Sequence, residues 1–229
     1  MPKPKKFRYK VLYEDAHLMA IDKPAGLLTV PIPDMPSTNL QQMVQQDFGK
    51  RVRPVHRIDR YTSGIVVFSK TGRIHHQLVK QFRNREPRRV YQALVRGRVD
   101  PPEATLVHHL KLIKTGFRNI VVNENNPDGT RAELVYKLIK QYPKAALLRV
   151  ELVTGLKNQI RVQLSEAGLP LIGDRHYSPG EEHEKWINRQ ALHAAELSII
   201  HPLTQKRLTF RSPIAQDMQK LIDKYKAMK

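Results

Sequence analysis

The sequence lacks several features, and each absence narrows what the protein can do. It contains no cysteine, which excludes disulfide bonds, cysteine-ligated zinc and a thiol nucleophile. Its glycines form neither the GxxxxGK[ST] nor the GxGxxG pattern of phosphate-binding loops. It also has no Gly-x-Ser-x-Gly nucleophile elbow. These absences argue against a nucleotide-driven enzyme and against a serine hydrolase of the elbow type.

Long hydrophobic runs are also missing. No apolar stretch approaches the roughly 18 residues that a membrane span requires. The first ten residues are basic and contain proline, which is not typical of a secretory signal. We therefore expect a cytoplasmic protein. The 229 residues suit a single domain, with residues 1–9 as a disordered basic arm and residues 10–229 as the folded part.

Acidic residues are scarce relative to basic ones. Forty Lys and Arg against 21 Asp and Glu give a net charge of 40 − 21 = +19, and the isoelectric point is about 10.2. An excess of this size favours a polyanionic partner, most commonly a nucleic acid. The alternative is a solvated surface that only keeps the protein soluble.

Hydrophobic periodicity predicts more strands than helices. Strands are predicted at residues 11–13, 18–21, 65–68, 90–95, 134–139, 147–153, 192–200 and 207–210. Helices are predicted at 40–48, 71–82 and 214–226. The first of these starts with capping-box spacing from Thr38 to Gln41 and stops at Gly49. Residues 158–167 fit either a strand or a helix. The pattern favours an α+β domain around a mostly antiparallel or mixed sheet.

One acidic residue, Asp59, stands in a basic, loop-like segment just before the apolar run at 65–68. The basic residues of this segment are Lys50, Arg51, Arg53, His56, Arg57 and Arg60. A carboxylate here would repel a phosphate ligand, so phosphate binding alone does not explain it. Neighbouring arginines would keep Asp59 ionised, as a nucleophile or general base requires. A turn-capping role or an ion-pair role remains open.

A second basic cluster precedes the strand predicted at 90–95. It consists of Lys80, Arg83, Arg85, Arg88 and Arg89. The histidines show no metal-binding spacing of the HExxH kind, so we expect no metal site. The acidic run formed by Glu181, Glu182 and Glu184 is interpreted as a solvated face.

Residues 56–70 strongly resemble the signature of the RluA family of pseudouridine synthases. The segment HRIDRYTSGIVVFSK corresponds to the family pattern HRLDxxTSGLLVxAK and differs mainly by apolar exchanges. Four further stretches resemble family motifs in the same order. They lie at residues 12–27, 89–97, 154–177 and 192–202. The resemblance extends over residues 11–213, and its order and spacing make it specific.

The resemblance implies a fold, an activity and a set of site residues. The fold would be the pseudouridine synthase domain, a long mixed sheet with flanking helices and a central cleft. Asp59 would be the catalytic aspartate, Tyr91 would lie against the uracil ring, and Arg161 would pair with the aspartate. No metal or organic cofactor is implied. From the pattern alone, Tyr91 would be a core aromatic residue and Arg161 a surface helix residue. RNA contacts are expected from Lys23, Arg53, Arg57, Arg60, Arg88 and Arg89.

The sequence also departs from the family pattern. Leu156 replaces an arginine, while Asn158 and Gln163 replace histidines, which puts standard local RNA contacts in doubt. Many relatives carry an S4 RNA-binding domain ahead of the catalytic domain, and residues 1–10 are too short to hold one. RNA affinity is therefore expected to come from the catalytic domain itself.

The expected reaction converts uridine to pseudouridine in tRNA or large-subunit ribosomal RNA, by a monomer. Asp59 could attack C6 of the base, attack C1′ of the ribose, or remove the C2′ proton, and the sequence does not choose among these routes. The uridine must be flipped out of the RNA, and Arg57 is the candidate to fill the gap or clamp a phosphate. Rival functions are a non-catalytic RNA-binding protein and another base-modifying enzyme. Intact Asp59, Tyr91 and Arg161 argue against the first. The missing zinc ligands and cofactor loop argue against a deaminase or methyltransferase.

Overall fold

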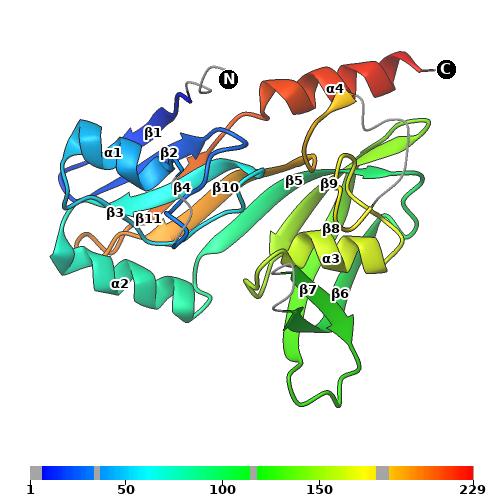
Figure 1. The fold of residues 1–229 in the computed structure, drawn as a ribbon, viewed down its shortest axis with the longest axis horizontal. Helices are drawn as coiled ribbons and strands as arrows, with labels where there is room; N and C mark the ends of the chain where they lie inside the picture. The colour runs from blue at the N-terminus through cyan, green and yellow to red at the C-terminus, as the bar shows by residue number, and fades with distance from the viewer. Residues whose placement is uncertain (1–6, 34–36, 114–117, 179–185, 229) are drawn as a thin grey trace. The chain divides into compact units, whose positions relative to one another are not determined.

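The computed structural model describes residues 7–33, 37–113, 118–178 and 186–228 (Figure 1). The chain divides into two compact units. The first comprises Met1–Pro87 and Glu196–Pro213, and the second comprises Arg88–Ala195 and Ile214–Lys229. Two predictions concern residues outside the described ranges: most of the basic arm, at positions 1–6, and the acidic run at positions 181–184.

The first unit is a small sheet with two helices. Its elements are β1 (Lys10–Glu14), β2 (Leu18–Lys23), α1 (Leu40–Phe48), β3 (Arg53–Pro54), β4 (Ser63–Ser69), α2 (Gly72–Arg83), the end of β10 (Leu192–Ile200) and β11 (Arg207–Arg211). Strand β2 pairs with β1 and β4, β3 pairs with β4, and β11 pairs with β10. All seven residues of β4 are buried, as the apolar run predicted. Figure 1 shows α1 and α2 on opposite sides of these strands.

The two helices of this unit are stabilised by a buried apolar face and by a capping residue. Ile74 and Leu78 of α2 are spaced by one helical turn and pack into the cluster that contains Ile65 and Val67 of β4. Helix α1 is capped by Asn39, whose side chain accepts a hydrogen bond from the Gln42 N–H. The predicted capping box at Thr38 is therefore displaced by one residue, because the buried Asn39 side chain takes the capping position.

The second unit is a five-stranded antiparallel ladder that β10 extends, with a helix on each face. Its elements are β5 (Arg88–Arg96), β6 (Glu103–Ile113), β7 (Arg118–Val122), β8 (Thr130–Gln141), β9 (Ala145–Leu152), α3 (Gln159–Glu166), the start of β10 and α4 (Gln216–Ala227). The ladder order is β5-β9-β8-β6-β7. Ala93 belongs to the hydrophobic cluster under α3, and its neighbour Leu94 belongs to the cluster under α4. Adjacent strand residues point to opposite faces, so the two helices cover opposite faces.

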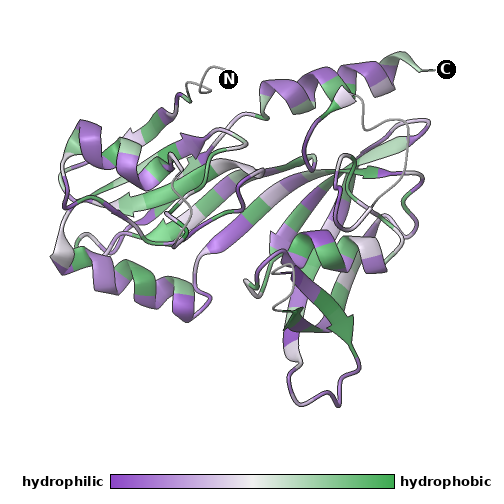
Figure 2. Ribbon diagram, in the orientation of Figure 1, coloured by the Kyte–Doolittle hydropathy of each residue, from purple (hydrophilic) through white to green (hydrophobic). Residues whose placement is uncertain are grey.

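The α+β class and the mostly antiparallel sheet are confirmed. The ambiguous segment at 158–167 is helix α3, whose Ile160 and Leu164 are buried against the ladder. Strands β3, β6 and β7 were not predicted. In Figure 2, hydrophilic and hydrophobic residues alternate along α2 and α4, as expected for helices with one buried face. Among the described residues, no helix is both long and apolar enough to cross a membrane. The central cleft remains a prediction.

Candidate active site

Asp59 lies in the first unit, in the turn that leads into β4. Its carbonyl oxygen accepts a hydrogen bond from the Thr62 N–H at 3.1 Å, which closes the turn. The preceding residue, Ile58, is buried, and the Thr29 hydroxyl holds both of its backbone polar groups. The hydroxyl donates to the Ile58 carbonyl at 2.9 Å and accepts from the Ile58 N–H at 3.4 Å. The Asp59 side chain is half-buried. The turn therefore presents the carboxylate from a fixed backbone.

The other side of Asp59 is fixed by the loop after β2. The Gly26 N–H donates to the Arg60 carbonyl at 2.8 Å, and the Arg60 Nε donates back to the Gly26 carbonyl at 3.0 Å. Gly26 has a φ of 89°, a conformation that favours glycine. Asp59 is thus bracketed by Thr29 on one side and Gly26 on the other.

Lys23 contributes to the same clamp from inside the protein. Its side chain is 0% exposed. Its ammonium donates to the carbonyl oxygens of Pro24, Leu27 and Arg60, at 3.0, 2.8 and 3.1 Å. The prediction that Lys23 contacts RNA is wrong, because no part of the side chain reaches the surface. A buried ammonium requires such partners, and here they fix the backbone next to Asp59.

Tyr91 lies in the second unit, in the middle of β5. Its register partner is Val150 of β9, and its half-buried ring packs against the cluster that contains Ile160 of α3. A tyrosine that is partly exposed at the end of an apolar cluster can offer a ring face and a hydroxyl to a ligand. That Tyr91 and Asp59 meet at one uracil ring remains a prediction.

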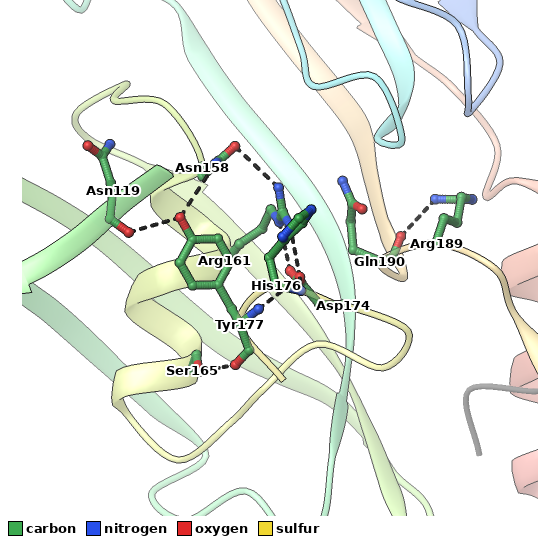
Figure 3. Close-up of polar contacts among 9 residues, drawn as sticks. All are labelled: Asn119, Asn158, Arg161, Ser165, Asp174, His176, Tyr177, Arg189 and Gln190. Atoms are coloured by element: carbon green, nitrogen blue, oxygen red, sulfur yellow. Dashed lines mark hydrogen bonds and ion pairs between the residues drawn. The ribbon is translucent and has the colours of Figure 1, made fainter. Parts of the chain in front are cut away.

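Arg161 is buried on α3 and forms an ion pair within the second unit. Its Nε and Nη2 donate to the two carboxylate oxygens of Asp174, at 2.7 and 2.8 Å (Figure 3). Asp174 also accepts from the backbone N–H groups of His176 and Tyr177. Burial alone would raise the pKa of Asp174. The Arg161 guanidinium and the two N–H groups outweigh burial and hold that pKa below its usual value.

The third guanidinium nitrogen of Arg161 points to Asn158, one of the departures from the family pattern. Its Nη1 donates to the Asn158 Oδ1 at 3.3 Å. The Asn158 amide in turn donates to the Tyr177 hydroxyl at 3.4 Å, and that hydroxyl donates to the Asn119 carbonyl at 2.9 Å (Figure 3). The guanidinium lies 5.0 Å from the centre of the Tyr177 ring. Arg161 is therefore positioned by Asp174, Asn158 and Tyr177, and its predicted pairing with Asp59 stays a prediction.

Gln163, another departure, belongs to a buried amide chain beneath α3. Its amide donates to the carbonyl oxygens of Leu106 and Ala132, at 3.1 and 3.2 Å. Its side-chain oxygen, Oε1, accepts a hydrogen bond from the Gln159 amide at 2.9 Å. These contacts attach α3 to β6 and β8. Gln163 is fully buried, so the replacement of the family's histidine by glutamine affects how helix α3 packs.

The predicted RNA-contacting arginines fall into two groups. Arg53, Arg57 and Arg60 are exposed in the first unit. Arg89, in contrast, donates to the carbonyl oxygens of Val153 and Thr154, at 3.3 and 3.2 Å, and Arg88 pairs with Glu151. A Cβ added to Gly155 would lie 2.2 Å from the Arg89 Nη1. Arg89 therefore braces the loop before α3.

Sequence reasoning did not assign a role to Asp174, although it was part of the Gly173-Asp174 motif. Gly173 has a φ of 76°, and a Cβ there would lie 2.2 Å from the Arg189 carbonyl oxygen. Only glycine fits this turn, and the turn delivers Asp174 to Arg161. No cluster of three or more metal-ligating side chains occurs in the described part of the chain.

Comparison with known proteins places these features in a family. A family model described as RNA pseudouridylate synthase matches residues 17–166. The chain is 34% identical over 213 residues to the dual-specificity RNA pseudouridine synthase RluA of Haemophilus influenzae, covering 88% of this chain and 91% of that protein. It is 33% identical over 240 residues to the ribosomal large subunit pseudouridine synthase D of Zymomonas mobilis, covering 95% and 73%. The solved structure of human RNA pseudouridylate synthase domain containing 4 has a TM-score of 0.77, with 22% identity and coverage of 94% and 92%, and shares the fold.

Proposed function

Because the chain belongs to the RluA family of RNA pseudouridine synthases, we propose that Asp59 is the residue that makes and breaks bonds at the target uridine. The observation that carries this proposal is the clamp around the Asp59 turn. Thr29 and Lys23 fix the peptides on either side of this residue, while the exposed side chains of Arg57 and Arg60 flank it. A preorganised carboxylate among cations is what a nucleophile or base for an RNA substrate requires.

The reaction is an isomerisation that needs no external reductant or energy source. The bond from N1 to C1′ breaks, a bond from C5 to C1′ forms, the C5 proton leaves and N1 gains a proton. Asp59 acts either as a nucleophile at C1′ or C6, or as a base toward the C2′ proton. Each route requires the ionised carboxylate and returns it unchanged at the end of the cycle.

Tyr91 and Arg161 complete the proposed site. Tyr91 supplies the ring that lies against the uracil, and its hydroxyl is suited to take up the C5 proton. Arg161, already oriented by Asp174, offers a fixed positive charge toward the ionised Asp59. The two hydrogen bonds from Arg161 to Asp174 would hold this charge in place before the substrate binds.

Arg57 is proposed to act on the RNA. A uridine inside a structured RNA must leave its stack to reach Asp59, and the gap costs less if a side chain occupies it. Arg57 is exposed, lies two residues before Asp59 and makes no side-chain hydrogen bond or ion pair with any residue that the structure describes, which suits a plug or phosphate clamp. We expect the protein to act as a cytoplasmic monomer without a metal or organic cofactor.

We propose that a stem-loop of tRNA or of large-subunit ribosomal RNA is a sufficient substrate. One relative is named for the ribosomal large subunit and another for dual specificity, and we rank the two choices about equally. A loop uridine is already partly unstacked, so flipping it costs less than flipping a paired one.

The test has two parts. Pseudouridines are first mapped in total RNA from cells with and without the gene, and the site that disappears identifies the substrate. An isolated stem-loop carrying that site is then compared with the full-length RNA in low salt. Comparable turnover supports the proposal. A stem-loop that stays unmodified while the intact RNA or ribosomal particle is modified contradicts it.

A further inference from the structure

The outward face of α2 is a stripe of basic side chains. Its members are Arg73, His76, Lys80 and Arg83, and all four are exposed. They follow one another at intervals of three, four and three residues, so at about 100° per residue they fall within an arc of about 80°. At about 1.5 Å per residue the stripe is about 15 Å long. The helix contains no acidic residue.

The charges of this stripe are not neutralised by the protein. Within the part of the chain that the structure describes, none of the four side chains forms an ion pair or a side-chain hydrogen bond. Three cations on the strands of the second unit behave differently, because each has a carboxylate partner. These pairs are Lys111 with Asp128, Arg131 with Glu133, and Lys137 with Glu103. A surface that only keeps a protein soluble mixes both signs, as those strands do.

A hollow lies beside the first turn of α2 and continues the positive surface. It has a volume of about 390 Å³ and is lined by Arg51, Arg53, Thr71, Gly72, His75 and His76. No acidic side chain lines it. Arg51 and Arg53 likewise have no ion pair among the described residues. The pKa of His75 is lowered by burial and by the neighbouring His76 and Arg53 charges, which is consistent with a positive environment.

The hollow is far from Asp59 within the same unit. Arg53 of β3 pairs with Ser69 at the end of β4, whereas Asp59 precedes Ser63 at its start. Six residue steps at about 3.3 Å separate the two ends of the strand by about 20 Å. Arg53 therefore lies away from Asp59, although the sequence places both in one basic segment.

We propose that the α2 stripe and the hollow at its first turn bind the phosphate backbone of the substrate RNA, about 20 Å from the reacting uridine. The inference rests on the proposed function of Asp59, because the distance is counted from that residue. Phosphate contacts of this kind give affinity without reading sequence and weaken as salt rises. At about 3.4 Å per phosphate along one duplex strand, the surface would contact the stem on the order of six nucleotides from the flipped base.

The experiment measures binding of two RNA hairpins that share one loop but have stems of about 5 and about 12 base pairs, lengths chosen from that spacing. The full-length protein is compared with the triple variant Arg73→Gln/Lys80→Gln/Arg83→Gln. The matched control is Lys111→Gln/Arg131→Gln/Lys137→Gln, which removes three paired cations from the second unit. Affinities are measured over a range of salt concentrations, and thermal melting checks that each variant is folded.

For the long hairpin, the stripe variant is expected to lose at least about tenfold in affinity. The slope of log affinity against log salt should become shallower by about 2 to 3. The short hairpin should be affected much less, and the control variant should behave like the wild type. Because binding is measured and not turnover, the result does not depend on which residue is catalytic.

Four outcomes would overturn the proposal. One is unchanged long-hairpin affinity in the stripe variant, and a second is an equal loss in the control variant. The third is an equal loss for both hairpins, which would place the stripe at the loop and not along the stem. Unchanged RNA affinity with lost binding to vesicles of anionic lipid would also overturn it, by assigning the surface to a membrane.

Discussion

The Asp174→Asn substitution should strongly destabilise the second unit. Asp174 is fully buried and receives two hydrogen bonds from Arg161, at 2.7 and 2.8 Å, and two more from backbone N–H groups. Removing its charge leaves the Arg161 guanidinium buried without its partner, which costs about 3–5 kcal/mol. At about 2–4 °C per kcal/mol for a chain of this size, Tm should fall by about 6–20 °C.

The assay is denaturant and thermal unfolding of a double-mutant cycle. Arg161→Met and Asp174→Leu are each expected to destabilise the protein strongly, while the double variant should recover much of the loss because no charge stays buried. Asp174→Asn with a cost below about 1 kcal/mol, or single costs that simply add, would refute the buried-pair reasoning.

The same ion pair predicts an acid dependence of stability. Arg161 and the N–H groups hold the pKa of Asp174 below its usual value despite burial. A carboxyl with a depressed folded-state pKa stabilises the fold above its unfolded-state pKa of about 3.9, and the contribution disappears as pH falls through the folded-state value. Below about pH 4 the wild type should therefore lose stability more steeply than Asp174→Asn, as measured by urea unfolding across pH.

Three further substitutions test single features. Tyr91→Phe keeps the ring and removes the hydroxyl, so turnover should fall far more than RNA affinity, and normal turnover would confine Tyr91 to stacking. Lys23→Met removes three hydrogen bonds from a buried ammonium and should cost about 3 kcal/mol of stability, whereas lost RNA affinity at full stability would restore the surface role. Gly155→Ala places a methyl group 2.2 Å from the Arg89 Nη1 and should cost about 1–2 kcal/mol, measured by unfolding. Combining it with Arg89→Ala should add little, and full additivity would contradict the predicted clash.

Elements with a clear apolar pattern were predictable from the sequence. The unbroken run at 65–68 identified β4, because a strand buried on both faces is apolar throughout. The four-residue spacing of Ile74 and Leu78 identified α2, because one buried helix face leaves a clear period. Strands β6 and β7 were missed because burial does not follow hydrophobicity there: Val107 and Leu112 of β6 are exposed, while Asn119 of β7 is buried. The segment at 158–167 became a helix because tertiary packing of Ile160 and Leu164 selected one of two compatible patterns.

The sequence was sufficient to identify site residues that belong to a family motif. It was not sufficient for roles that depend on contacts in the folded protein. Asp59, Tyr91 and Arg161 could be named from the resemblance. The burial of Lys23 could not, because a basic side chain at the end of a strand has no sequence signal that distinguishes three internal carbonyl partners from solvent. Asp174 lies thirteen residues beyond Arg161 in the chain, and their pairing depends on the turn at Gly173.

The central claim is that the Asp59 carboxylate performs the chemistry and does not attract the RNA. Its most direct test is tritium release from RNA labelled at uridine C5, since that hydrogen must depart when the bond from C5 to C1′ forms. Asp59→Asn should release no tritium above background, while its affinity for the same RNA stays at or above that of the wild type, because a negative charge has been removed. Tritium release by Asp59→Asn at the wild-type rate would contradict the claim.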